Sequence, residues 1–367
     1  MSLLVEIVNA PSKIHHLKIK DWELLVRQAR GTQLLSYLAD ILKNNELYQS
    51  VPKQARNHFD AAVTFSIKQS INVKQECDNI SKALNEIGIK TIYLKGAAYS
   101  LKKLPLSNHR LLSDIDVLVE KKYLRKSEEQ LFKNGWFAET LSDYDDSYYR
   151  KWSHEIPPLK HVQRKTVLDL HHNILPITTI NSDINQQILI EHVEAIDTSN
   201  QSFVFSPALM VLHSAAHLFY ESEFEKGLRD LIDIKELVET FSVENDNFYQ
   251  EIQIKAKELG LERTLFYAFR YVTSILNTKI ENKLNASISA PTMPVLSLMD
   301  FCFNNVLIPN HSSCHDWKYN IAKFILYWRG HLLRMPLNLL LPHLARKSYM
   351  RIKDLFCKNE NSSTPIN

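Results

Sequence analysis

Two aspartates lie inside an apolar, strand-like segment of this 367-residue chain, at residues 111–119 (LLSDIDVLV). Asp114 and Asp116 alternate there with Ile115 and Val117. Side chains two residues apart in a strand point to the same face, so the two carboxylates are expected side by side. Like charges at that separation resist joint ionisation beside apolar neighbours, and a divalent cation removes the conflict. The segment therefore predicts a buried strand whose acids hold a hard cation such as Mg²⁺.

A third acid, Asp169, lies in a second strand-like segment and alternates with Leu168 and Leu170. On an adjoining strand it would share the face of the first two carboxylates. Three acids can hold two metal ions that clamp the attacking and leaving oxygens of a phosphoryl displacement. Asp169 would also be placed to accept a proton from the incoming hydroxyl. We therefore predict Asp114, Asp116 and Asp169 as metal ligands and catalytic residues.

A strand at residues 89–94 is predicted to stop at Lys95-Gly96, before a short helix at residues 97–104. A glycine at such a turn lets the backbone approach a phosphate, and the amides that open the helix point at the anion. Arg110 is predicted as a bidentate donor to a triphosphate. His171 shares the strand face of Asp169, and it either contacts substrate and orients that acid or is an ordinary partly buried histidine.

Composition excludes several other classes. With seven glycines the chain has no Gly-x-Gly-x-x-Gly or Gly-x₄-Gly-Lys-Ser/Thr motif, so Rossmann and P-loop nucleotide sites are disfavoured. The net charge of +3 is too small to indicate a dedicated nucleic-acid binder, so nucleic acid is not an expected partner. The four cysteines form no Cys-x-x-Cys pair, and the first residues show no secretion signal. A cytoplasmic protein is expected.

Together these motifs resemble the polymerase-beta-type nucleotidyltransferase superfamily. Within it the chain most resembles a bacterial family of mostly uncharacterised nucleotidyltransferases, over residues from about 75 to 180. The shared features are a Leu-Lys-Gly turn, an Asp-Ile-Asp strand, a His-Glu segment before a hairpin and a Leu-Asp-Leu-His motif at residues 168–171. One departure is Ala97, which stands after Gly96 where the superfamily usually has glycine or serine. A serine contact to phosphate is therefore missing.

The resemblance implies transfer of a nucleoside monophosphate from an NTP, with ATP as the expected donor, two Mg²⁺ ions and release of pyrophosphate. The expected acceptor is a hydroxyl group on a small molecule, a glycan or a peptide. The nucleotide-binding residues expected from the resemblance are Lys95, Gly96, Arg110, Ser113 and His171.

The predicted fold is α+β with a mixed sheet. We expect a helical N-terminal segment at residues 1–73, a polymerase-beta-like nucleotidyltransferase core at 74–195, an all-α C-terminal domain at 196–357 and a disordered tail at 358–367. Within the core, apolar spacing predicts a helix at residues 74–87, and the aspartate- and tyrosine-rich residues 143–149 are predicted to form a loop.

Several features of the sequence allow two interpretations. Residues 317–353 contain eight Lys or Arg and no acid, which is typical of a basic amphipathic helix that either contacts an anionic membrane or packs on the protein body. His213 and His217 stand one helical turn apart and either share a zinc ion or belong to the core. Arg229, Asp230 and Asp233 either reach the nucleotide or form ion pairs along a helix.

Two rival functions are also considered. Transfer to RNA, as in toxin-like relatives, conflicts with the modest net charge. A non-catalytic membrane-surface or scaffold protein that retains the fold conflicts with the intact set of three acids.

Overall fold

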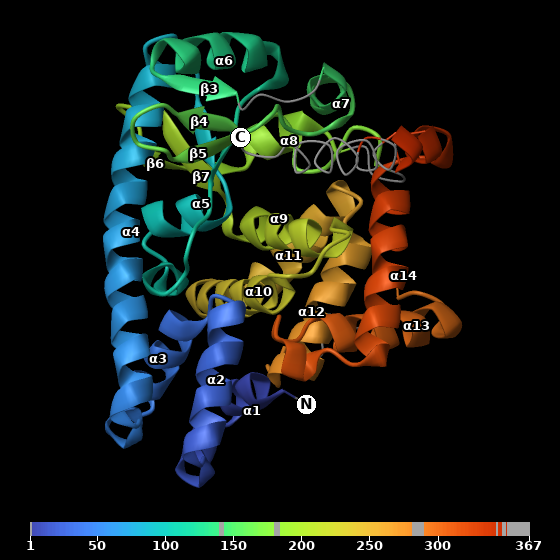
Figure 1. Ribbon diagram of the computed structural model, residues 1–367. Helices are drawn as coiled ribbons and strands as arrows, with labels where there is room; N and C mark the ends of the chain where they lie inside the picture. Colours follow the sequence, from blue (N-terminus) through green and yellow to red (C-terminus); the bar gives the residue numbers. More distant parts are fainter. Residues whose placement is uncertain are drawn as a thin grey trace, which may run out of the picture.

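The structure is a computed structural model that describes residues 2–138, 143–179, 184–280, 290–342, 344–346 and 350. Strands from these residues form one seven-stranded sheet in the order β3-β4-β5-β2-β1-β7-β6 (Figure 1). Their bounds are β1 Thr91–Tyr93, β2 Ile115–Leu118, β3 Trp136–Ala138, β4 Leu159–His161, β5 Val167–His171, β6 Val193–Asp197 and β7 Ser202–Phe205.

The sheet is mixed. β2 is parallel to β5 and β1 is parallel to β7, whereas β1–β2, β3–β4, β4–β5 and β6–β7 are antiparallel pairs. The predicted α+β class with a mixed sheet is therefore confirmed. The two parallel pairs join segments far apart in the sequence, so these pairings depend on long-range packing and not on hairpin turns.

One face of the sheet is apolar, with the helix α4 (Lys53–Asn85) packed on β1 and the helix α6 (Leu124–Lys133) on β3. The Tyr93 hydroxyl on β1 donates to the carbonyl oxygen of Cys77 on α4, which places Tyr93 on this face. Its register partner Val117 lies on the same face, since directly opposite residues share a side of the sheet. The alternating residue Asp116 therefore points to the opposite face.

The N-terminal helices are continuous with the core. They are α1 Leu3–Asn9, α2 Ile19–Gly31, α3 Leu35–Asn44 and α4. α4 contacts α3 through its first half and α5 (Lys95–Leu101), α6 and β1 through its second half. The predicted division at residues 73 and 74 therefore falls inside a single 33-residue helix, and the helix predicted at 74–87 is only its last part.

The C-terminal helices lie beside the sheet and end in an outer helix, α14 (Figure 1). β7, at residues 202–205, lies beyond the predicted boundary at residue 196 and pairs with β1, so the sheet includes residues that the prediction gave to an all-α domain. The helices are α8 Gln186–Glu191, α9 Pro207–Tyr220, α10 Gly227–Glu244, α11 Phe248–Glu258, α12 Glu262–Leu276, α13 Met293–Val306 and α14 Trp317–Arg334.

Residues 143–149 were predicted to form a loop, and this prediction was wrong. They lie in the helix α7 (Asp143–Trp152). Within it, Asp146 and Arg150 form an ion pair four residues apart, at 3.0 Å between Oδ2 and Nε. Such pairs stabilise an exposed helix whose composition alone favours a loop.

The acid-free segment at 317–353 begins with α14, which packs on the body of the protein. Arg329 on α14 donates to the carbonyl oxygen of Phe219 at 2.7 Å, and Arg334 donates to Ser222 Oγ at 2.7 Å. None of the described helices is long and apolar enough to cross a membrane. Contact of this segment with lipid stays a prediction, and the predicted disordered tail at 358–367 lies outside the described residues.

A candidate metal and nucleotide site

The three predicted acids meet at one place on the sheet. Asp116 on β2 and Asp169 on β5 are register partners in the parallel pair, on strands about 4.8 Å apart. Asp114 lies two residues before Asp116, just outside β2, and accepts a hydrogen bond from Ser113 Oγ at 3.0 Å. The carboxylates of Asp114 and Asp116 both contribute to raising the pKa of Asp169, as expected of close like charges.

Lys95 brings a positive charge to this group of acids. Its ammonium donates to Asp116 Oδ1 at 2.8 Å, and both side chains are largely buried. Burial alone would raise the pKa of Asp116, but Lys95 and a hydrogen bond from His171 hold it well below its usual range. Burial would likewise lower the pKa of Lys95, and Asp116 instead raises it. At neutral pH the site therefore holds an ionised Asp116–Lys95 pair.

The backbone of Lys95 is strained, with φ at 45° in the left-handed region. A residue with a Cβ rarely adopts this conformation without a compensating interaction. Here the strained turn directs the lysine from the end of β1 towards the neighbouring strand β2. The predicted Lys-Gly turn is thus present, and its strain lies at the lysine.

Gly96 is buried, and close packing explains why this position requires glycine. A Cβ at Gly96 would lie 2.8 Å from Leu112 Cγ, closer than carbon atoms approach without a shift. Leu112 precedes Ser113 and Asp114, so the absence of a side chain at Gly96 allows the acid-bearing segment to come close to the start of α5. The predicted contact of Gly96 with phosphate stays a prediction.

A fourth carboxylate, Glu155, joins the site. It forms an isolated antiparallel bridge with His171 at the end of β5. His171 Nε2 lies 3.1 Å from Asp116 Oδ1 and 3.4 Å from Glu155 Oε2. The sequence signal for Glu155 was the His-Glu pair before the hairpin, but without the bridge nothing connected it to the three acids. Pro157 and Pro158 separate this bridge from β4, because proline has no N–H group to continue a ladder.

The carboxylates outnumber the nearby cations. Burial, together with the charges of Glu155 and Asp116, raises the pKa of Asp169 to about 7. Burial also raises the pKa of Glu155. Asp169 Oδ1 is buried and has no hydrogen-bond partner among the described residues. The site thus has four acids, one lysine bound to one of them, and a buried carboxylate oxygen without a partner. Divalent cations bind such an excess of carboxylate oxygens.

Helices α9 and α10 bring further groups towards the site. The hydroxyl groups of Tyr99 on α5 and Ser214 on α9 are hydrogen-bonded, so α9 packs beside the helix that Lys95 begins. Burial and the charge of Lys95 lower the pKa of both His213 and His217. Lys226, just before α10, donates from Nζ to Ser113 Oγ at 3.3 Å. The segment that carries Ser113 and Asp114 therefore has a second lysine within reach. In the described part of the chain, the group with metal-ligand spacing is His154, Glu155 and His171, and it does not include the α9 histidines.

Arg110 is bound in a buried ion-pair network with acids of α10. Its Nε donates to Asp233 on α10, and its NH2 group lies 3.8 Å from Asp230. Arg229 binds Asp230 at 2.8 Å and Gln33 at 2.6 Å. The network ties the segment before Asp114 to α10. Binding of a triphosphate by Arg110 stays a prediction.

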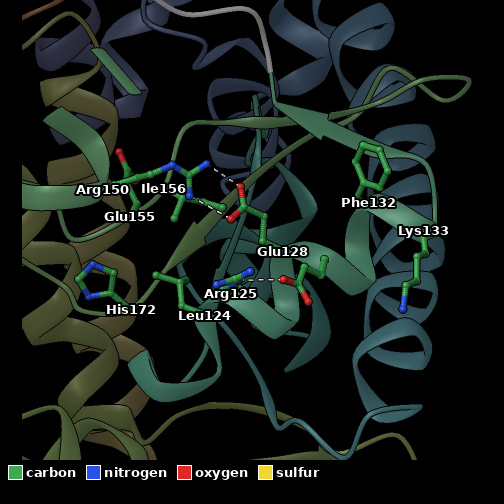
Figure 2. Close-up of a pocket in the computed structure, with 10 residues that line it drawn as sticks. Leu124, Arg125, Glu128, Phe132, Lys133, Arg150, Glu155, Ile156 and His172 are labelled. Carbon is green, nitrogen blue, oxygen red and sulfur yellow. Dashed lines mark hydrogen bonds and ion pairs between the residues drawn. The ribbon is translucent and has the colours of Figure 1, made fainter. Parts of the chain in front are cut away.

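A cavity of about 790 Å³ lies beside the site, between α6 and α7 (Figure 2). Leu124 and Phe132 provide apolar walls, and Arg150 forms two hydrogen bonds with Glu128, at 2.8 and 3.0 Å. Glu155 also lines the cavity, together with His172. The cavity therefore shares Glu155 with the group of acids.

Comparison with known proteins identifies the family of the chain. No curated protein sequence matches the chain. Residues 19–277, more than half of the chain, match a family described as "Uncharacterised nucleotidyltransferase", as the sequence motifs predicted. The chain therefore belongs to this nucleotidyltransferase family and is an enzyme of this kind.

Proposed function

We propose that this enzyme transfers a nucleoside monophosphate from a magnesium-bound NTP to a hydroxyl group, with release of pyrophosphate. The observation that carries the proposal is the register pairing of Asp116 with Asp169, with Asp114 two residues away and Lys95 bound to Asp116. This arrangement provides the two kinds of group that a phosphoryl-transfer site needs, oxygen ligands for cations and a fixed positive charge for phosphate.

Asp114, Asp116 and Asp169 would hold the metal ions, since the excess of carboxylates and the unpaired Asp169 Oδ1 fit divalent cations. When bound, two Mg²⁺ ions would neutralise the triphosphate and stabilise the charge that develops on its oxygens. The chain's own contribution is the position of these ligands. Asp116 and Asp169 are carried on paired strands, which are more precise supports than loops.

The other polar groups have assigned roles in this proposal. Lys95 and Lys226 would contact the triphosphate from two sides, with Ser113 between Lys226 and Asp114. Asp169 would accept the proton of the acceptor hydroxyl at a carboxylate oxygen. In the metal-free protein His171 would orient Asp116 through the contact at 3.1 Å. Arg110 would act by positioning the acid-bearing segment, because its guanidinium is occupied by Asp233 and Asp230.

For the acceptor we propose a small molecule, a glycan or a peptide that enters through the cavity beside Glu155. The partly apolar lining and volume of this cavity support an acceptor larger than water. ATP is the proposed donor. We place the enzyme in the cytoplasm, and contact of residues 317–353 with anionic lipid remains part of the proposal. RNA is the second candidate acceptor, and the small net charge disfavours it.

Nucleotide binding and transfer test the proposal separately. Calorimetry with each of the four NTPs, in Mg²⁺ and in EDTA, is expected to show binding that requires the metal. Incubation of the enzyme with α-³²P-labelled NTPs and either a metabolite extract or tRNA is expected to label a component of the extract. Asp116→Asn should abolish the labelling and leave the circular dichroism spectrum unchanged. Equal labelling by Asp116→Asn and the native enzyme would disprove the proposal.

A further inference from the structure

We propose that one of the two metal positions has histidine ligands, His154 and His171, together with Glu155, and therefore selects a transition-metal ion over Mg²⁺. This inference rests on the proposed function, because it concerns the same site. It replaces one of the two Mg²⁺ ions of that proposal with a transition-metal ion, and it differs from the prediction made from the sequence, in which only the aspartates bind metal.

The spacing of the ligand atoms supports this assignment. One atom from each of His154, Glu155 and His171 can be chosen so that all three lie within 4.8 Å of one another. His171 Nε2 is 3.1 Å from Asp116 Oδ1 and 3.4 Å from Glu155 Oε2. Ligands bound at roughly 2.1 Å lie about 3.0 Å apart in an octahedron and about 3.4 Å apart in a tetrahedron. The His171–Glu155 pair already has the separation found in a tetrahedral site, and His154 lies within 4.8 Å of both, so a small movement of its side chain would complete the set.

The backbone holds these ligands in place before any ion arrives. Glu155 and His171 are bridge partners, and the N–H group of His172 donates to the carbonyl oxygen of His154 at 2.8 Å. The N–H group of Ile156 donates to the carbonyl oxygen of Leu170 at 3.1 Å. Backbone hydrogen bonds on both sides of Glu155 thus tie His154 and Glu155 to the end of β5, which carries His171. A preorganised set of ligands costs less conformational entropy on binding.

An unpaired nitrogen gives a second, independent indication. His154 Nδ1 is buried and has no hydrogen-bond partner among the described residues. A buried polar atom without a partner costs free energy that a bound ligand can recover. The ring of His154 lies 5.2 Å from the ring of His171, between centroids. The two imidazoles are therefore close enough to serve one ion.

The chemistry of these ligands determines the class of metal. Two imidazoles and a carboxylate suit Mn²⁺, Fe²⁺, Co²⁺ or Zn²⁺, whereas Mg²⁺ prefers oxygen ligands alone. Asp114 and Asp169 offer only oxygen and would keep Mg²⁺. Asp116 belongs to both groups, since it is the register partner of Asp169 and contacts His171. The enzyme would then use a mixed pair of ions that share Asp116.

Pulsed electron paramagnetic resonance of Mn²⁺ bound to the full chain tests this directly, without any acceptor. The native protein is expected to show nitrogen couplings from imidazole. His154→Gln and Glu155→Gln should each weaken Mn²⁺ binding about 10-fold or more, by analogy with losses at other metal sites. His154→Gln should also remove part of the nitrogen coupling. Mg²⁺ binding should change less than twofold in both variants.

The matched control is His16→Gln, at an exposed position outside the site. His154 is chosen over His171 because His171 is 2% exposed and its replacement endangers folding. Bound Mn²⁺ without nitrogen coupling, or equal Mn²⁺ affinity in His154→Gln and the native protein, would overturn the inference and leave the proposed function intact. Absence of both Mn²⁺ binding and Mg-NTP binding would overturn the two together.

Discussion

Asp116 and Asp169 stand directly opposite each other in the parallel pair β2 and β5, although 52 residues of sequence lie between them (residues 117–168). Their neighbours Ile115 and Leu168 are also partners and point to the apolar face under α4 and α6. A slip of one residue would turn Asp169 into the core and a leucine towards Asp116. The packing of the core therefore also sets the position of the acids.

Replacement of Asp169 by asparagine should remove activity while preserving the fold. The change keeps the shape of the side chain but removes a proposed metal ligand that is also the proposed proton acceptor, so the rate of transfer should fall about 100-fold or more. Steady-state rates with a saturating labelled NTP measure this. Asp246→Asn, at an exposed position before α11, is the control and should keep full activity. A rate for Asp169→Asn within twofold of the native rate would contradict the assignment.

Replacement of Lys95 by methionine should destabilise the metal-free protein by about 3 kcal/mol, because it removes the lysine charge paired with the buried carboxylate of Asp116 and leaves only the contact with His171. Mg²⁺ should stabilise this variant more than it stabilises the native protein, since the ion replaces the lost charge. Urea denaturation in EDTA and in Mg²⁺ measures both effects. The same response to Mg²⁺ in the two proteins would show that Asp116 does not bind the ion.

The contact between Gly96 and Leu112 predicts a pair of compensating changes. Gly96→Ala should cost roughly 1–3 kcal/mol, because the new Cβ would overlap Leu112. Leu112→Ala should also destabilise the protein, but the double variant should lose less than the sum of the two changes, since the smaller side chain makes room. Free energies of unfolding for the four proteins give the interaction energy. Strict additivity would mean that Gly96 is required for another reason.

The buried network of Arg110 should contribute far more to stability than an exposed ion pair. Arg110→Met leaves Asp233 buried without its partner and should cost about 3 kcal/mol. Arg125, which is 91% exposed and pairs with Glu129, provides the matched control, and Arg125→Met should cost less than about 0.5 kcal/mol. Chemical denaturation distinguishes these outcomes, and equal losses would show that the network is not a structural support.

His109 should make the protein sensitive to acid. Burial, together with the charge of Arg110, lowers the pKa of His109 from 6.5 to about 4. His109 therefore binds a proton more readily in the unfolded chain than in the folded protein. Its contribution to the free energy of unfolding is complete above pH 6.5 and is lost as the pH falls towards 4. The expected loss at pH 5, relative to pH 7, is about 2 kcal/mol.

His109→Phe keeps a ring against Tyr37, whose centroid lies 4.8 Å from that of His109, and removes the titrating group. Unfolding free energies of both proteins at several pH values between 5 and 7 provide the comparison. The variant should lose about 2 kcal/mol less than the native protein over this range. Parallel curves for the two proteins would exclude His109 as the cause.

The local pattern of the sequence was sufficient to predict the strands that carry the acids. Asp114, Asp116 and Asp169 alternate with apolar residues, and the two-residue period of a strand depends only on backbone geometry. The Lys95-Gly96 turn followed from the change between a β-branched run and a short helix. These motifs also identified the family, because each belongs to a short stretch of chain. The catalytic roles of the residues remain predictions.

Tertiary structure alone decided which distant segments meet. β7 joins the sheet through a parallel pair with β1, and no local turn motif in the sequence predicts such a pair. Glu155 reaches His171 through a single bridge, and Arg110 finds Asp233 on a helix more than a hundred residues away. In each case, the free energy of burying apolar surface and pairing charges brings the partners together. That free energy depends on the whole folded chain, whereas the period of a strand is a property of its own residues.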